Sequence, residues 1–161
     1  KDVTASKPHE RPVNTVFQSY ALFPHMTILE NVAFGLKQRK IEDPMTKAVA
    51  ALELVELGHL AQRRPQQLSG GQQQRVAIAR AIVAKPSVIL ADEPTGNLDS
   101  KTSYDIMSLF HELHQKGNTI IMVTHEDDIA HYAHRIVRLR DGLVETDKIN
   151  PNPTRGAAML V

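Results

Sequence analysis

The sequence predicts an α/β fold, in which a core built on a parallel sheet carries an inserted helical subdomain. Two short, continuous apolar runs, residues 88–91 and Thr119–Val123, have the length of buried strands. Between them Ile106, Leu109, Phe110 and Leu113 recur at helical spacing. Continuous apolar strands that alternate with helices are typical of a parallel sheet covered on both faces.

The elements before residue 87 are one strand and then three helices. Val13–Phe17 is rich in β-branched residues and predicts a strand that ends at Gln18. Thr27 and Glu30 have the spacing of a capping box and predict a helix that ends near Gly35.

The second predicted helix begins at Asp43 and Pro44, a capping residue followed by a proline suited to the first turn. Its expected buried stripe, which continues up to Gly58, consists of Met45, Val49, Leu52 and Leu57.

A third helix is expected to begin at Ser69 and to stop before Pro86. Near the end of the chain, apolar residues flank Asp141 and Gly142, a pair typical of a tight hairpin turn. From Lys148 onward we expect a loose tail.

Composition restricts the possible functions. With 42% hydrophobic residues in 161, the chain can bury a core, and with no cysteine it can form neither a disulfide nor a thiolate metal site. A net charge of +1 gives no indication of a nucleic-acid partner. No apolar stretch reaches the roughly 20 residues of a membrane-spanning helix. The first residues lack the apolar core of a secretory signal, and the missing initial methionine fits a cleaved or excised piece.

Three groups of residues carry chemistry. Ser69, Gly70, Gly71 and Gln72 open a helix, where backbone amides and the helix dipole attract anionic oxygen such as phosphate. An ordinary glycine-flanked cap is the alternative for a lone Ser-Gly-Gly, but the longer run Leu-Ser-Gly-Gly-Gln-Gln-Gln-Arg favours a phosphate site.

The second and third groups end the two apolar strands. Asp92 and Glu93 lie where parallel sheets place ligands; Asp92 suits Mg²⁺ or its waters, and Glu93 suits a base for an attacking water. Taken alone, the two acids are equally well explained as a structural pair. His125 ends the next strand and could hydrogen-bond a terminal phosphate.

Together these residues resemble the nucleotide-binding subunit of ABC transporters. The resemblance implies a partial P-loop NTPase (RecA-like) domain over residues 1–147, with 1–23 and 87–147 as core, 24–86 as helical signature subdomain and 148–161 as tail. It also assigns roles: Gln18 is the Q-loop glutamine beside Mg²⁺, Leu68 to Gln72 the signature that contacts ATP in trans, Asp92 the Walker B aspartate that holds the metal, Glu93 the catalytic glutamate, Asp99 the D-loop aspartate, and His125 the catalytic switch histidine.

By the same resemblance the cofactors are ATP and Mg²⁺, and the partners are a second nucleotide-binding subunit and a transmembrane permease, with no nucleic acid. The subunit is expected in the cytoplasm, peripheral at the inner face of the cell membrane. The 161 residues contain no G-x-x-x-x-G-K-[ST] phosphate loop, so we expect a truncated chain that is inactive alone.

Different motifs resemble different branches of the family. Residues 17–27 are similar to polyamine, sugar and iron importers, whereas residues 90–100 are similar to macrolide-efflux and lipoprotein-release ATPases. Two alternatives to a transporter ATPase stay open: a soluble ABC ATPase, and a non-enzymatic module that supplies the signature face or binds a membrane partner.

Overall fold

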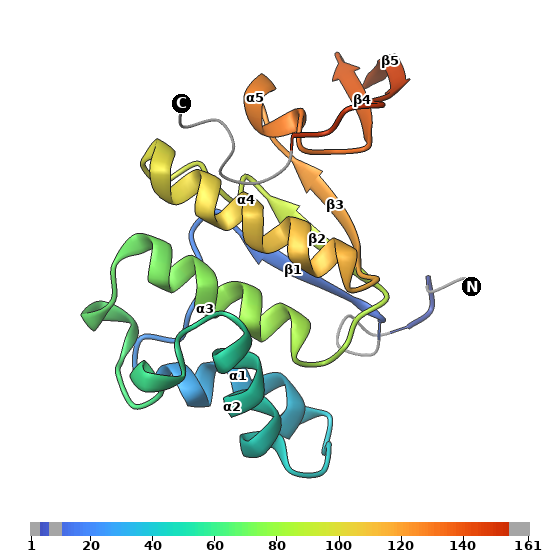
Figure 1. Ribbon diagram of the computed structural model, residues 1–161. Coiled ribbons are helices and arrows are strands. Elements are labelled where there is room, and N and C mark those ends of the chain that lie inside the picture. Colours follow the sequence, from blue (N-terminus) through green and yellow to red (C-terminus); the bar gives the residue numbers. More distant parts are fainter. Residues whose placement is uncertain (1–3, 7–10, 155–161) are drawn as a thin grey trace.

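The structure is a computed structural model that describes residues 4–6 and 11–154. Figure 1 shows helices gathered at one end of the molecule, a small sheet in the middle and a hairpin at the other end. The principal elements, in chain order, are β1 (Val13–Phe17), α1 (Ile28–Gln38), α2 (Pro44–Leu54), α3 (Gly70–Ile82), β2 (Val88–Asp92), α4 (Ser100–Gln115), β3 (Thr119–Val123), α5 (Asp127–Ala130), β4 (Arg135–Arg140) and β5 (Leu143–Ile149). Two 3₁₀ turns, η2 (Gly58–Leu60) and η3 (Pro65–Gln67), lie between α2 and α3.

The central sheet confirms the predicted α/β class. Its three strands are parallel in the order β1-β2-β3, and Phe17, Asp92 and Val123 are paired at their carboxyl ends. Helices α3 and α4 pack on one face, which buries Val16, Ile89 and Ala91. The expectation that the sheet is covered on both faces is wrong for the described residues.

On the other face of the sheet, which contains the paired positions Thr15, Leu90 and Ile121, side chains remain open to solvent. Phe17 is 43% exposed, Ile121 52% and Val123 58%. We call Phe17, Ile121 and Val123 the open sheet face. An apolar run predicts a strand fit for burial, but it does not indicate whether the same chain supplies the cover.

The helical part agrees with prediction at its starts and differs at its ends. The capping box of Thr27 and Glu30 begins α1 as expected. The helix then continues past Gly35 to Gln38, because the buried Leu36 extends the apolar stripe by another turn. A glycine inside a helix is unfavourable but tolerated where packing continues beyond it.

Helix α2 begins at Pro44 as predicted, but its cap and half of its predicted stripe are wrong. Asp43 adopts φ 51° and makes no side-chain capping bond. Leu52 and Leu57 are buried as predicted, whereas Met45 and Val49 are exposed, and the helix ends at Leu54, before Gly58. The residues that α2 buries are Ala48, Ala51 and Leu52, because small side chains let it approach α1 and α3 closely.

The end of the chain forms the predicted hairpin. Strands β4 and β5 pair antiparallel around Asp141 and Gly142. Strand β5 extends through Ile149, so Lys148 belongs to the hairpin and does not begin a loose tail; residues 155–161 lie outside the described residues. None of the described helices is long and apolar enough to cross a membrane.

Candidate functional site

The carboxyl ends of the three parallel strands bring the predicted residues to one edge of the sheet. Phe17, Asp92 and Val123 are in register, so the residues that follow them emerge side by side. Gln18, Glu93 and His125 therefore come from three separate segments to a single edge, as their positions after the strands predict.

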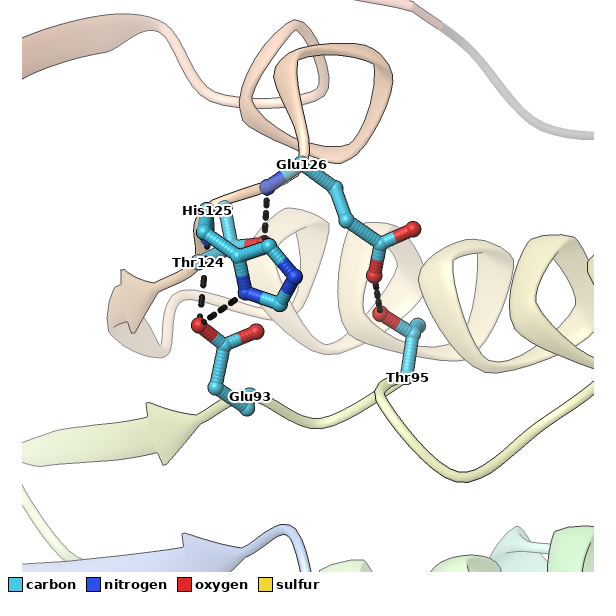
Figure 2. Close-up of polar contacts among 5 residues, drawn as sticks. All are labelled: Glu93, Thr95, Thr124, His125 and Glu126. Carbon is cyan, nitrogen blue, oxygen red and sulfur yellow. Dashed lines mark hydrogen bonds and ion pairs between the residues drawn. The ribbon is translucent and has the colours of Figure 1, made fainter.

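Glu93 and His125 are in direct contact at this edge (Figure 2). One carboxylate oxygen of Glu93, Oε1, lies 2.8 Å from Nδ1 of His125 and accepts a hydrogen bond from its backbone N–H at 3.1 Å. The Glu93 backbone adopts φ 45°, a left-handed conformation that a non-glycine residue rarely adopts outside constrained sites. The carboxylate is thus aimed by an unusual backbone geometry and fixed by two donors.

The Glu93–His125 pair leaves one carboxylate oxygen without a hydrogen bond and changes the pKa of the histidine. The other carboxylate oxygen of Glu93, Oε2, is buried and has no hydrogen-bond partner among the described residues. The hydrogen bond to Glu93, helped by its negative charge, raises the pKa of His125 above its ordinary value, although the imidazole is mostly exposed. A held carboxylate with one unsatisfied oxygen can orient a water molecule and accept its proton.

A second contact, which the sequence did not predict, reinforces this edge. The buried hydroxyl of Thr95 donates to Glu126 Oε1 at 3.3 Å, and the backbone N–H of Glu126 donates to Thr124 Oγ1 at 3.1 Å (Figure 2). These bonds join the loop after β2 to the start of α5. Nothing in the local pattern around Thr95 indicates a partner 31 residues away.

Two residues are predicted to lie at Mg²⁺: Gln18, which directly follows β1, and Asp92, which ends β2. Gln18 packs over Gly96, where an added Cβ would lie 2.5 Å from its amide nitrogen, and its carbonyl accepts a bond from Asn97 at 2.9 Å. Asp92 is exposed at the end of β2. The described residues contain no group of three or more His, Cys, Asp or Glu side chains that could hold a metal ion.

The predicted phosphate-binding turn has the expected geometry. Ser69 caps α3: its hydroxyl accepts from the backbone N–H of Gln72 at 3.3 Å, and the side chain of Gln72 accepts from the backbone N–H of Ser69 at 3.0 Å. The amides of Gly70 and Gly71 belong to the first turn, which leaves them without intrahelical acceptors. They are suited to an anion.

Both glycines are also required by close packing. A Cβ on Gly70 would lie 2.9 Å from the hydroxyl oxygen of Tyr20, and a Cβ on Gly71 would collide with the methyl group of Thr102. The signature turn therefore lies against the loop after β1 and the start of α4. In the described part of the chain, no hydrogen bond connects the signature turn, residues 69–72, with Glu93 or His125.

Asp99 has a local role in this structure. It caps α4, because Oδ1 accepts from the backbone N–H of Thr102 at 3.0 Å and Oδ2 accepts from its hydroxyl at 2.6 Å. These bonds lower the pKa of Asp99. Any contact with a second subunit would begin from a carboxylate that is already oriented.

Comparison with known proteins finds a matching family and several relatives. Residues 1–96 match the ABC transporter family. The chain is 51% identical over 151 residues to the spermidine/putrescine import ATP-binding protein PotA of Mannheimia succiniciproducens. This match covers 91% of the chain and 40% of PotA. It is 52% identical over 147 residues to the macrolide export ATP-binding/permease protein MacB of Chlorobium phaeobacteroides, covering 87% of the chain and 22% of MacB.

A solved structure has the same fold. The ATP-binding cassette MJ0796, a dimer in a post-hydrolysis state bound to ADP and Pi, superposes with a TM-score of 0.75 at 42% identity, covering 88% of this chain and 64% of the cassette. The importer and exporter groups that different motifs resemble both occur among the relatives. The chain spans about 40% of the length of the PotA relatives that it matches.

Proposed function

The chain belongs to the ABC transporter family, and from this premise we propose that it is part of an ATP-hydrolysing subunit that drives transport across a membrane. Within these 161 residues its role is to offer the signature turn to an ATP molecule held by a second subunit. The observation that carries the proposal is the capped turn at Ser69, whose glycine amides lack intrahelical acceptors, in the same chain as the Glu93–His125 pair.

Each residue then has a chemical task. The amides of Gly70 and Gly71, with the hydroxyl of Ser69, would bind phosphate oxygens at the positive end of α3. Glu93 would orient the attacking water through its unsatisfied Oε2, while His125 holds Oε1 and senses the terminal phosphate. Gln18 and Asp92 would hold Mg²⁺, which neutralises charge on the phosphates when it is bound.

The partners that we propose follow from the same roles. A signature turn that serves ATP in trans needs a second nucleotide-binding subunit, with Asp99 near the contact. A permease would bind the helical part and keep the subunit at the inner face of the membrane. We assign recognition of the transported molecule to the permease and propose no nucleic-acid partner, since the net charge is only +1.

One observation favours a second candidate, a non-enzymatic module that contributes only the signature face. The 161 residues contain no G-x-x-x-x-G-K-[ST] motif, whose lysine and amides would neutralise the transferring phosphate. For this reason we expect the isolated chain to show no ATP hydrolysis above the buffer background.

Calorimetry with ATP and Mg²⁺, together with a phosphate-release assay, tests the two candidates on the purified chain. Nucleotide binding separates them: measurable binding of ATP favours the ATPase subunit, and its absence favours the module, while no turnover is expected of the isolated 161 residues in either case. Turnover that disappears in Glu93→Gln would show that these residues form a complete ATPase. In that case the module role would be excluded.

A further inference from the structure

Arg80, in the last turn of α3, reaches the loop that follows β1. Its Nη1 donates to the carbonyl of Ala21 at 2.6 Å, and its Nη2 donates to the carbonyl of Tyr20 at 3.0 Å. The planar guanidinium thus holds two successive main-chain carbonyls in the way that a fork holds a carboxylate. Helix α3 and the loop after Gln18 are 59 and 60 residues apart along the chain at these contacts.

The segment that Arg80 holds has an unfavourable backbone. Tyr20 adopts φ 61° and Ala21 φ 48°, two successive left-handed residues, neither of which is glycine. The local main-chain bonds of these two residues run from the N–H of Tyr20 to the carbonyl of Phe17 and from the N–H of Ala21 to the carbonyl of Ser19. Such a conformation persists only where surrounding contacts determine it, and Arg80 binds both of its carbonyls.

Arg80 is also unlike the arginines that make ion pairs. Four others in the described residues each pair with a carboxylate: Arg75, Arg135, Arg138 and Arg140. No described acidic residue forms an ion pair with Arg80, which is half-buried and whose pKa is lowered by that burial. A half-buried cation bonded to carbonyls alone is placed for geometry, because it has no opposite charge to neutralise.

The contact joins two of the segments described above. Gln18 immediately precedes the held loop, and Ser69 caps the same helix that carries Arg80. Asn14, in β1, adds a second tie to this end of α3 by donating to the carbonyl of Ala81 at 2.6 Å. We propose that Arg80 is a positioning residue. It fastens the loop after Gln18 to α3, so that Gln18 and the signature turn keep one relative position.

The importance of this coupling for ATP binding and hydrolysis rests on the proposed function, but the coupling itself can be measured without nucleotide. The chain has no cysteine, so Ser19→Cys and Gln73→Cys introduce two specific sites for spin labels. Pulsed electron paramagnetic resonance then gives the distribution of distances between the loop and α3. We expect one narrow distribution in the doubly labelled parent.

Arg80→Met keeps the length of the side chain and removes every donor. We expect the width of the distribution to at least double, because the left-handed loop loses its restraint. The matched control is Arg75→Met on the same helix, where the lost guanidinium bonds are to Val55 and Glu56. That variant should keep the parent's width, even if its thermal midpoint falls as far as that of Arg80→Met.

Arg80→Lys supplies a single ammonium and should give an intermediate width. If circular dichroism shows that Arg80→Met does not fold, Arg80→Lys tests the proposal in its place. The distance distribution of Arg80→Lys must then still be wider than that of Arg75→Met. Equal widths in the parent and Arg80→Met, or equal widths in Arg80→Lys and Arg75→Met, would overturn the proposal whether or not the chain binds ATP.

Discussion

The helical part of the molecule and its sheet differ in how completely they are packed. In the helices, Ile28, Leu52 and Ile78 have no exposed surface, and the described residues themselves enclose them. In the sheet, one face is covered by α3 and α4 (Figure 1). On the opposite face, Ile121 and Val123 are more than half exposed. The hairpin continues the contrast, since Leu139 and Leu143 are mostly exposed.

This difference separates two kinds of functional residue. The signature turn at Ser69 belongs to a region that these residues complete, so its geometry depends on local caps and buried helix contacts. Glu93 and His125 lie on a sheet whose other face still has apolar side chains to cover. We therefore expect the signature turn to be formed within these residues and the geometry of the sheet edge to depend on further packing.

The largest effect should come from a cavity in the helical part. Leu52→Ala removes a fully buried side chain and should destabilise the protein by about 2–5 kcal/mol. The matched change on the open sheet face, Ile121→Ala, should cost about 1 kcal/mol or less, because the side chain is already half exposed. Urea unfolding followed by circular dichroism measures both. Equal losses would show that the open sheet face is covered in solution.

A second experiment tests whether the open sheet face drives self-association. We expect the parent to associate as its concentration rises, because the exposed apolar side chains of the open sheet face and the unpaired strand edges favour contact between copies. Replacing Ile121 and Val123 by threonine should shift association to higher concentration while the strand persists.

Met45→Gln, which alters an exposed apolar side chain on α2, is the control and should leave association unchanged. Light scattering over a wide concentration range gives the answer. A parent that stays monomeric throughout would contradict the expectation.

The smallest effect concerns pH at the Glu93–His125 pair. Since the pKa of His125 is raised in the folded protein, protonated His125 stabilises the fold fully below its ordinary pKa. That contribution is lost as the pH rises through the raised value. Glu93→Gln should move the titration of His125 to lower pH.

Nuclear magnetic resonance of the parent and of Glu93→Gln can follow this titration. A His125 titration that is the same with glutamate and with glutamine at position 93 would contradict the contact in Figure 2.

Local signals predicted much of this structure. The caps at Thr27 and Ser69 work through residues three positions apart, so the sequence shows both partners. The gathering of Gln18, Glu93 and His125 followed from strands that end at the same edge of a parallel sheet.

The features that were missed depend on distant partners. Large residues such as Met45 and Val49 suggested the buried stripe of α2, but the close approach of the helices selects Ala48 and Ala51. Arg80 binds carbonyls, which every residue has, so no pattern marks its target.

We propose that the signature turn serves an ATP molecule held by a second subunit. The most direct test is whether this chain restores hydrolysis to a complete, related cassette whose own signature glycine is disabled. Because a side chain at position 71 would meet the methyl group of Thr102, the comparison is best made with Thr102→Ser, which removes that methyl and keeps the hydroxyl that Asp99 binds. Adding Gly71→Ala controls for bulk, and adding Gly71→Asp places a carboxylate where phosphate must bind. We expect that mixing restores ATP hydrolysis, that Gly71→Ala keeps part of it, and that Gly71→Asp abolishes it. Restoration that is indifferent to Gly71→Asp would show that the signature turn is not what the chain contributes.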